Sequence, residues 1–311
     1  MDKQARVFVA GHRGMVGSAI VRRLEKDGFT NVVVRSREDL DLCSQSQVAS
    51  FFKDERIDHV ILAAAKVGGV WSNAIEPADY IYQNLMIESN VIHAAYQYRV
   101  QSLLFLGSSC IYPKHAPQPI SESALLQGEL EKTNEAYAIA KIAGLKLCEF
   151  YNQQYNTRFI AVMPTNLYGP GDQYDPTHSH VMAALIRKVH QAKVNGKKNI
   201  TIWGTGTPKR EFLYVDDLAE ACLFLMTRAS CPDLVNIGVG KELSILDLVH
   251  VISEVLAHPV SVTHDLDKPD GTMQKRLDVS KMTELGWEAT TSLKEGIALA
   301  YADFLEQETR S

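Results

Sequence analysis

The sequence predicts an α/β protein with a doubly wound parallel sheet and a second, smaller α/β domain. Three observations predict this fold. Short β-branched runs alternate with helical patterns over the first half of the chain, a glycine-rich turn follows the first run, and Gly and Pro break the alternation within residues 167–180. The predicted first domain therefore covers 1–167 with a return at 212–240, and the second covers 168–211 and 241–311.

The elements of the first domain follow one another in strand–helix order. Runs rich in Val, Ile and Leu predict strands, and apolar residues three or four positions apart predict helices. We expect strands at 6–11, 31–36, 59–65, 102–109 and 158–166, and helices at 17–28, 46–55, 84–98 and 134–155. Later segments do not continue this alternation, so they predict a smaller domain, with part of the chain returning to the first domain. These segments lie at 180–192, 199–204, 212–226, 234–238, 244–256 and 260–265.

Composition narrows the class of protein and of partner. The 311 residues are 46% hydrophobic and 22% charged, which is typical of a globular enzyme. A net charge of -5 without a long Lys/Arg run argues against a nucleic acid polymer or a membrane surface as partner. We expect a cytoplasmic protein, because the chain shows neither a signal peptide nor a membrane-length apolar run. Five cysteines without a CxxC pair argue against a disulfide framework and a structural metal site.

A phosphate-binding turn follows the first predicted strand. The stretch "GHRGMVG" has glycines at a GxxGxxG spacing and runs directly into a helix. Without Cβ atoms the backbone turns tightly and approaches a pyrophosphate, whose charge faces the helix N-terminus. The context is that of a Rossmann-type dinucleotide site, for which we predict contacts from Gly11, His12, Arg13, Gly14, Met15, Val16 and Gly17.

The end of the second predicted strand favours NADP over NAD. Arg35 and Arg37 stand there, where an NAD site usually presents an acid to the ribose hydroxyls. An arginine at this corner accommodates a 2′-phosphate instead. The alternative is a pair of solvated surface arginines, since Glu38 and Asp39 follow at once.

Three residues predict a proton-transfer site. Tyr137 and Lys141 are four positions apart, so a helix presents them on one face, and Ser108 ends a strand at the carboxyl edge of the sheet. A neighbouring ammonium should favour the ionised phenol and bring its pKa closer to neutral pH. Taken alone, the YxxxK spacing is also compatible with chance or packing.

With these motifs the sequence resembles the extended short-chain dehydrogenase/reductase family over nearly the whole chain. The phrases "GSSCIYPK", "AIAKIAG", "MPTNLYGP", "SHVM" and "KPDGT" are similar to one branch, whose enzymes epimerise GDP-4-keto-6-deoxy-D-mannose at C3 and C5 and reduce C4 with NADPH. The resemblance implies Ser-Tyr-Lys chemistry, a GDP-sugar substrate and a helix-mediated homodimer. It also implies cofactor contacts from Leu106, Gly107, Lys141, Pro164, Asn166, Leu167 and His180.

Inversion of a carbon needs a base on one face and an acid on the other. The resemblance makes Cys110 the base and His180 the acid. Cys110 reaches the same cleft as Ser108 if the backbone stays extended, because alternate residues share a face. A packed thiol and a structural histidine are the alternatives, and His178 competes with His180. Nothing in the sequence indicates what would activate the thiol.

The resemblance also implies substrate contacts in the second domain. Positive charge for the pyrophosphate is available from Arg187 and from the implied contacts Lys188 and Arg210. The remaining implied substrate contacts are Ser108, Asn166, Trp203 and Asp270. The alternatives are solvated charge for Lys188 and Arg210, core packing for Trp203, a turn for Asp270 and a loop cap for Asn166. A related nucleotide-sugar epimerase or reductase would not need Cys110 and His180, and an NADP-binding sensor would not need Tyr137 and Lys141.

Overall fold

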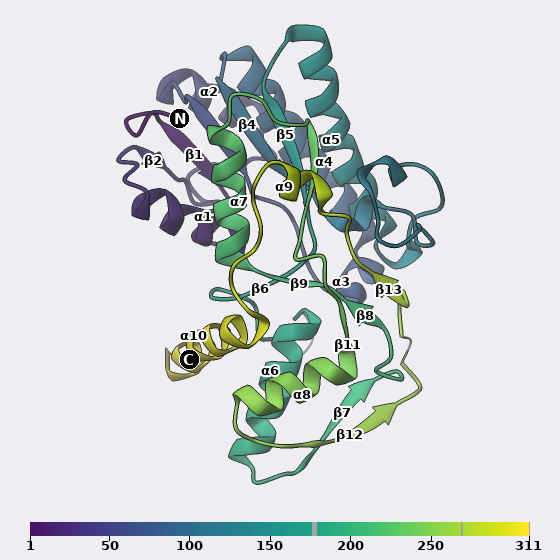
Figure 1. Cartoon of the computed structure of the whole chain (residues 1–311). Helices are drawn as coiled ribbons and strands as arrows, with labels where there is room; N and C mark the ends of the chain where they lie inside the picture. Colours follow the sequence, from purple (N-terminus) through teal and green to yellow (C-terminus); the bar gives the residue numbers. More distant parts are fainter. Residues whose placement is uncertain (176–178, 269, 311) are drawn as a thin grey trace.

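The large lobe is built on one parallel sheet (Figure 1). The computed structural model describes residues 1–175, 179–268 and 270–310. Six strands pair in parallel in the spatial order β10-β5-β4-β3-β1-β2, so the predicted doubly wound sheet is confirmed. Their bounds are β1 (Val7–Ala10), β2 (Val32–Val33), β3 (His59–Leu62), β4 (Ser102–Leu106), β5 (Phe159–Pro164) and β10 (Leu234–Ile237).

Helices cover both faces of this sheet. Alternate strand residues point to opposite faces: Val7 and Val9 pack with α1 and α7, whereas Phe8 and Ala10 pack with the helices of the other face. Both faces are therefore apolar, as a parallel sheet requires. The helices of this lobe are α1 (Met15–Lys26), α2 (Gln45–Glu55), α3 (Val70–Ile75), α4 (Pro77–Gln97), α5 (Glu135–Tyr155), α7 (Val215–Thr227) and α9 (Ser280–Glu284).

The small lobe lies below the sheet in Figure 1 and has its own apolar core. Three helices pack around a two-stranded parallel pair, with Leu248 and Ile297 fully buried between them. Its elements are α6 (Val181–Val194), α8 (Ile245–Val255), α10 (Leu293–Arg310), β7 (Asn199–Trp203) and β12 (Ser261–Asp265).

Short strands join the two lobes. They form a three-stranded sheet in the order β11-β8-β13 and a parallel pair of β6 with β9. The bounds are β6 (Asn166–Tyr168), β8 (Lys209–Arg210), β9 (Phe212–Tyr214), β11 (Leu243–Ser244) and β13 (Gln274–Lys275). The described residues also contain three single 3₁₀ turns, which are η1 (Ser109–Ile111), η2 (Glu122–Ala124) and η3 (Lys132–Asn134).

The chain crosses between the lobes more often than the predicted bounds provide for. After β13 it returns to the large sheet, where Leu277, Met282 and Trp287 are buried. We therefore propose that a domain division should assign 277–287 to the first domain, although 241–311 was expected in the second.

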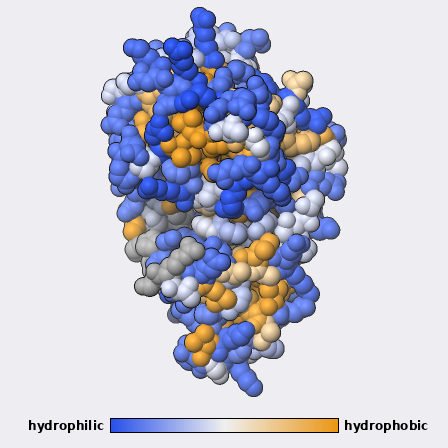
Figure 2. Space-filling model, turned by 90° about the vertical axis from the view of Figure 1, so that its left-hand side faces the viewer, coloured by the Kyte–Doolittle hydropathy of each residue, from blue (hydrophilic) through white to orange (hydrophobic). Residues whose placement is uncertain are grey.

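The surface is mostly hydrophilic on the side that Figure 2 shows, with separate apolar patches on the upper and lower lobes. Among the described residues, no helix combines the length and the apolarity needed to cross a membrane. All five cysteines are free thiols.

Candidate active site

A cavity of about 1390 Å³ lies at the carboxyl ends of the large sheet, where the two lobes meet. Doubly wound proteins bind ligands at this edge. The structure brings nearly all the predicted site residues to its wall: Gly11, His12, Arg13, Gly14, Met15, Val16, Gly17, Arg35, Arg37, Leu106, Gly107, Ser108, Cys110, Tyr137, Lys141, Pro164, Asn166, Leu167, His180, Trp203, Arg210 and Asp270. Lys188 is not among the residues that line it.

The glycine turn fits a dinucleotide. Gly11 adopts a φ of 87°, and a Cβ at Gly17 would lie 2.1 Å from the Gly11 carbonyl oxygen, so α1 packs against the turn only with glycine there. Gly14 is the N-cap of α1, and a Cβ on it would meet nothing closer than 3.5 Å. The N-terminus of α1 therefore opens onto free space in the cavity, which suits a pyrophosphate.

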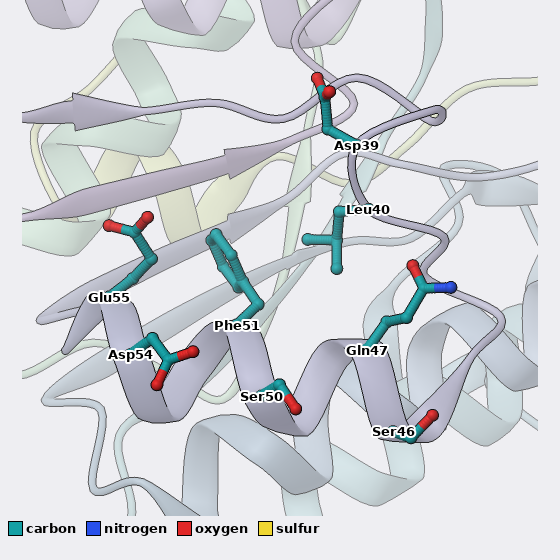
Figure 3. A pocket seen from close by; sticks show the side chains of 8 residues that line it. All are labelled: Asp39, Leu40, Ser46, Gln47, Ser50, Phe51, Asp54 and Glu55. Carbon is teal, nitrogen blue, oxygen red and sulfur yellow. The ribbon is translucent and has the colours of Figure 1, made fainter.

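The two arginines at the cofactor end differ in their partners. Arg35 forms an ion pair with Glu55 and donates to the Val34 carbonyl oxygen at 2.8 Å. Figure 3 shows Glu55 pointing from the last turn of α2 toward the strands, beside a shallow hollow of about 430 Å³. Arg37 is exposed and has no ion-pair or hydrogen-bond partner among the described residues. Of these two arginines, Arg37 is therefore the one whose guanidinium is not already held by another residue of the described chain.

Ser108, Tyr137 and Lys141 converge in the cavity. Lys141 is 2% exposed, donates to the Leu106 carbonyl oxygen at 2.9 Å, and lies 5.8 Å from the centre of the Tyr137 ring. Burial raises the pKa of the Tyr137 phenol above its ordinary value, and the hydrogen bond with Ser108 opposes this rise only in part.

The expectation that the ammonium of Lys141 brings the pKa of Tyr137 closer to neutral pH is wrong in this structure, where the pKa is raised. The Lys141 ammonium lies 3.0 Å from the carboxylate of Glu88, a residue of α4 that is 1% exposed. Glu88 offsets the positive charge and itself raises the pKa of the phenol. Tyr137 is consequently a protonated acid in the protein.

Cys110 lines the cavity, but not for the expected reason. The backbone does not stay extended beyond Ser108; it forms η1, and the Cys110 amide donates to the Ser108 hydroxyl oxygen at 3.2 Å. The turn carries the half-buried thiol to the cavity wall. There its Sγ accepts from the Asn134 amide at 3.2 Å and lies 3.8 Å from the Lys275 ammonium. No sequence motif marks Asn134 or Lys275, so neither was predicted at the site.

His180 is the N-cap residue of α6 and faces the cavity. His180 keeps an exposed surface at the cavity wall, and the protein that packs around the rest of the imidazole lowers its pKa from the ordinary value by desolvation. The imidazole is then mostly neutral at neutral pH. The competing His178 lies outside the described residues.

The predicted substrate contacts of the small lobe divide into two groups. Trp203 is 58% exposed at the end of β7, which excludes core packing, and Arg210 lies on β8 nearby in the cavity wall. Asp270 accepts from the amide and the hydroxyl of Thr205 at 2.7 and 2.9 Å, so it also holds a turn.

Lys188 and Asn166 make contacts that are structural. Lys188 donates to the Thr201 carbonyl oxygen at 2.8 Å and stays outside the cavity wall, so the structure does not bring it to the other predicted contacts. The Asn166 side chain donates to the Glu211 carbonyl oxygen at 2.8 Å and links β6 to β9, while it also lines the cavity.

Comparisons with known proteins show the family to which the chain belongs. A sequence model described as "NAD dependent epimerase/dehydratase family" matches residues 7–238. GDP-L-fucose synthase 1 of Arabidopsis thaliana is 55% identical over 305 residues, which are 98% of this chain and 94% of the relative. GDP-L-fucose synthase of Escherichia coli (strain K12) is 53% identical, covering 100% and 99%. A solved GDP-L-fucose synthetase from Naegleria fowleri, bound to NADP, has a TM-score of 0.91 at 26% identity, covering 100% and 97%.

Proposed function

The chain belongs to the NAD dependent epimerase/dehydratase family, and we propose that it is an NADPH-dependent GDP-L-fucose synthase. It converts GDP-4-keto-6-deoxy-D-mannose to GDP-L-fucose by epimerisation at C3 and C5 and reduction at C4. One observation carries this proposal: Cys110 and His180 line the same cavity as the Ser108–Tyr137–Lys141 group. Relatives with this activity match the chain over nearly its full length at more than half identity.

The large-lobe part of the cavity takes NADP(H). The residues of the glycine turn hold the pyrophosphate, and Arg37 meets the 2′-phosphate. When bound, the reduced nicotinamide supplies the hydride that C4 receives. On the chain's side, the protonated Tyr137 hydroxyl gives its proton to the C4 oxygen, and Ser108 holds that oxygen by a hydrogen bond.

Epimerisation uses the acidity of the hydrogens beside the C4 ketone. The Cys110 thiolate takes the proton from C3 or C5 and becomes a thiol, while the electron pair of the broken C–H bond moves into an enolate. His180 assists delivery of a proton to the opposite face of that carbon, and the ketone is restored. No oxidant or reductant is needed for this half of the reaction.

The first experiment identifies the product. We expect incubation of GDP-4-keto-6-deoxy-D-mannose with the protein and NADPH to yield GDP-L-fucose by NMR. Without a reductant, in deuterated water, the protein should place deuterium at C3 and C5, and Cys110→Ser should nearly abolish this exchange because a hydroxyl is a far weaker acid than a thiol. His180→Asn should alter the stereochemical outcome or slow turnover.

Two outcomes would favour other functions. Reduction at C4 without exchange at C3 and C5, at the same rate in folded Cys110→Ser, would indicate a simple nucleotide-sugar reductase. NADP binding without any turnover of GDP-sugars would indicate a nonenzymatic NADP-binding sensor.

We further propose a cytoplasmic homodimer. A reducing compartment keeps Cys110 available as a thiol, and all five cysteines are free. Large apolar side chains are exposed on α4 and α5, which pack together at one side of the large lobe: Tyr82 (62%), Ile139 (42%), Phe150 (53%) and Tyr155 (45%). Such a surface suits a self-complementary contact between two copies.

A further inference from the structure

The Cys110 sulfur lies between two donors that come from distant parts of the chain. Asn134, the last residue of η3, places its amide nitrogen 3.2 Å from Sγ. Lys275, on β13 and 165 positions from Cys110 in sequence, places its ammonium 3.8 Å away. All three residues line the cavity, so these donors meet the sulfur where substrate enters.

Lys275 differs from the other lysines of the cavity wall. Four lysines line it, and three have a carboxylate partner: Lys66 pairs with Glu76 at 2.8 Å, Lys114 with Glu131 at 2.9 Å, and Lys141 with Glu88 at 3.0 Å. Within the described part of the chain, Lys275 pairs with no carboxylate. Its ammonium therefore lies beside the thiol without the ion-pair partner that each of the other three has.

We propose that Lys275, together with Asn134, is a positioning residue that stabilises Cys110 as a thiolate and holds the sulfur toward the substrate. This inference rests on the proposed function, in which Cys110 is the base. A positive charge within about 4 Å and a hydrogen-bond donor both favour the anionic form of a sulfur. The Tyr137 phenol also interacts with the sulfur, but it is protonated and adds no negative charge to oppose the thiolate.

The test measures thiolate content directly and needs neither substrate nor cofactor. The pH dependence of Cys110 alkylation by iodoacetamide is followed by peptide mass spectrometry, which separates Cys110 from Cys43 and Cys231. In Lys275→Met the rate at neutral pH should fall about tenfold and recover at alkaline pH. Lys275→Arg should keep most of the parental rate, because the charge remains. Asn134→Ala should show a smaller loss than Lys275→Met.

Lys209→Met is the matched control. Lys209 is exposed on β8, the strand that pairs with β13, and its removal changes the net charge by the same amount. We expect parental alkylation of Cys110 in this variant. If Lys275→Met does not fold, Lys275→Gln replaces it, with the same expectation. Parental alkylation at neutral pH in a folded Lys275→Met or Lys275→Gln protein would overturn the inference.

Deuterium exchange separates this inference from the proposed function. Lys275→Met should slow exchange at C3 and C5 about tenfold at neutral pH, with NADPH binding unchanged, and Lys275→Arg should restore it. If alkylation falls as expected but the parent protein exchanges neither position, the thiolate is stabilised and the proposed epimerase function is wrong. If the parent exchanges both positions and Lys275→Met alkylates normally, the function stands and Lys275 has no part in it.

Discussion

At the scale of single residues, burial of the Tyr137 phenol determines how it acts, and the pairing of Lys141 with Glu88 adds to this effect. A phenol whose pKa is raised by burial stays protonated at neutral pH and is ready to give a proton to a developing alkoxide. Reduction is the direction of reaction that needs such an acid. Before any cofactor binds, the site therefore already holds the acid that reduction requires.

Tyr137→Phe should lose C4 reduction by about 10²- to 10⁴-fold, because no phenol then protonates the C4 oxygen. It should retain more C3/C5 exchange than Cys110→Ser. In the parent, the reduction rate should not fall between about pH 7 and 9 through ionisation of Tyr137, since a raised pKa keeps the phenol protonated there. NADPH oxidation across this range checks both expectations, with circular dichroism to confirm folding. Near-normal oxidation by folded Tyr137→Phe would exclude this acid.

Substitution of the two arginines at the cofactor end should change NADPH affinity to different extents. Arg37→Ala should weaken NADPH binding by about 10- to 100-fold, the range expected for one lost charge-assisted hydrogen bond, with little effect on NADH. Arg35→Ala should change NADPH affinity less, because Arg35 is already paired with Glu55. Titration by fluorescence or calorimetry measures each affinity. Equal use of NADH and NADPH by the parent would contradict the assignment of a 2′-phosphate site.

At the residue scale, the sequence predicted which residues line the cavity better than it predicted the contacts that those residues make. Cys110 was expected to reach the cavity through extended backbone and instead reaches it through a 3₁₀ turn, because the Ser108 side chain caps that turn. The pKa of Tyr137 was predicted in the wrong direction because burial of the phenol raises it, and Glu88, which adds to the rise, lies on another helix. Lys275 was missed because only the folded chain brings it to Cys110. The failures at Tyr137 and Lys275 concern contacts between segments that are distant in sequence, whereas the failure at Cys110 concerns a local turn.

At the scale of helices and strands, local sequence patterns were sufficient to predict the large sheet. Strand, glycine turn and helix are adjacent in sequence, and their hydrophobic periodicity reports burial directly. The hydrophobic pattern did not predict the short strands β6, β8, β9, β11 and β13 as separate elements. They are two or three residues long, and their pairings depend on where the two lobes meet.

The glycine turn offers a matched pair of substitutions. Gly17→Ala should destabilise the protein by about 1–3 kcal/mol or more, because the new Cβ overlaps the Gly11 carbonyl oxygen and α1 must move. Gly14→Ala has ordinary space for its Cβ, so it should remain close to parental stability yet weaken NADPH binding by filling the approach to the turn. Urea denaturation and NADPH titration measure the two effects. Equal stability of both variants would show that α1 does not depend on this close approach.

At the scale of the whole molecule, the cavity exists only because the chain crosses repeatedly between the lobes. The buried Glu211 carboxylate accepts from the amides of Val239 and Gly240 at 2.6 and 2.7 Å and of Leu277 at 2.9 Å. It thereby holds together, next to Arg210, three segments of the chain that pass between the lobes. Sequence patterns predicted two domains but not this joint, since its partners share no local periodicity.

The proposed dimer is testable at the same scale. Ile139 and Phe150 are about three helical turns apart, so both project from one face of α5, and both are exposed in the single chain. A charge there would be buried in a symmetric contact and left without a partner. Phe150→Glu should therefore give a monomer by light scattering, with the parent a dimer.

Val194→Glu is the control for this prediction. Val194 is 69% exposed at the end of α6 in the small lobe, so the same type of substitution should leave the dimer intact. Because the cavity is built from one chain, folded Phe150→Glu monomers should still bind NADPH, and any loss of turnover should follow their lower stability. A parent that is monomeric at all concentrations, or a Phe150→Glu variant that remains dimeric, would contradict the α4–α5 contact. In that case the exposed apolar side chains of these helices must have another role.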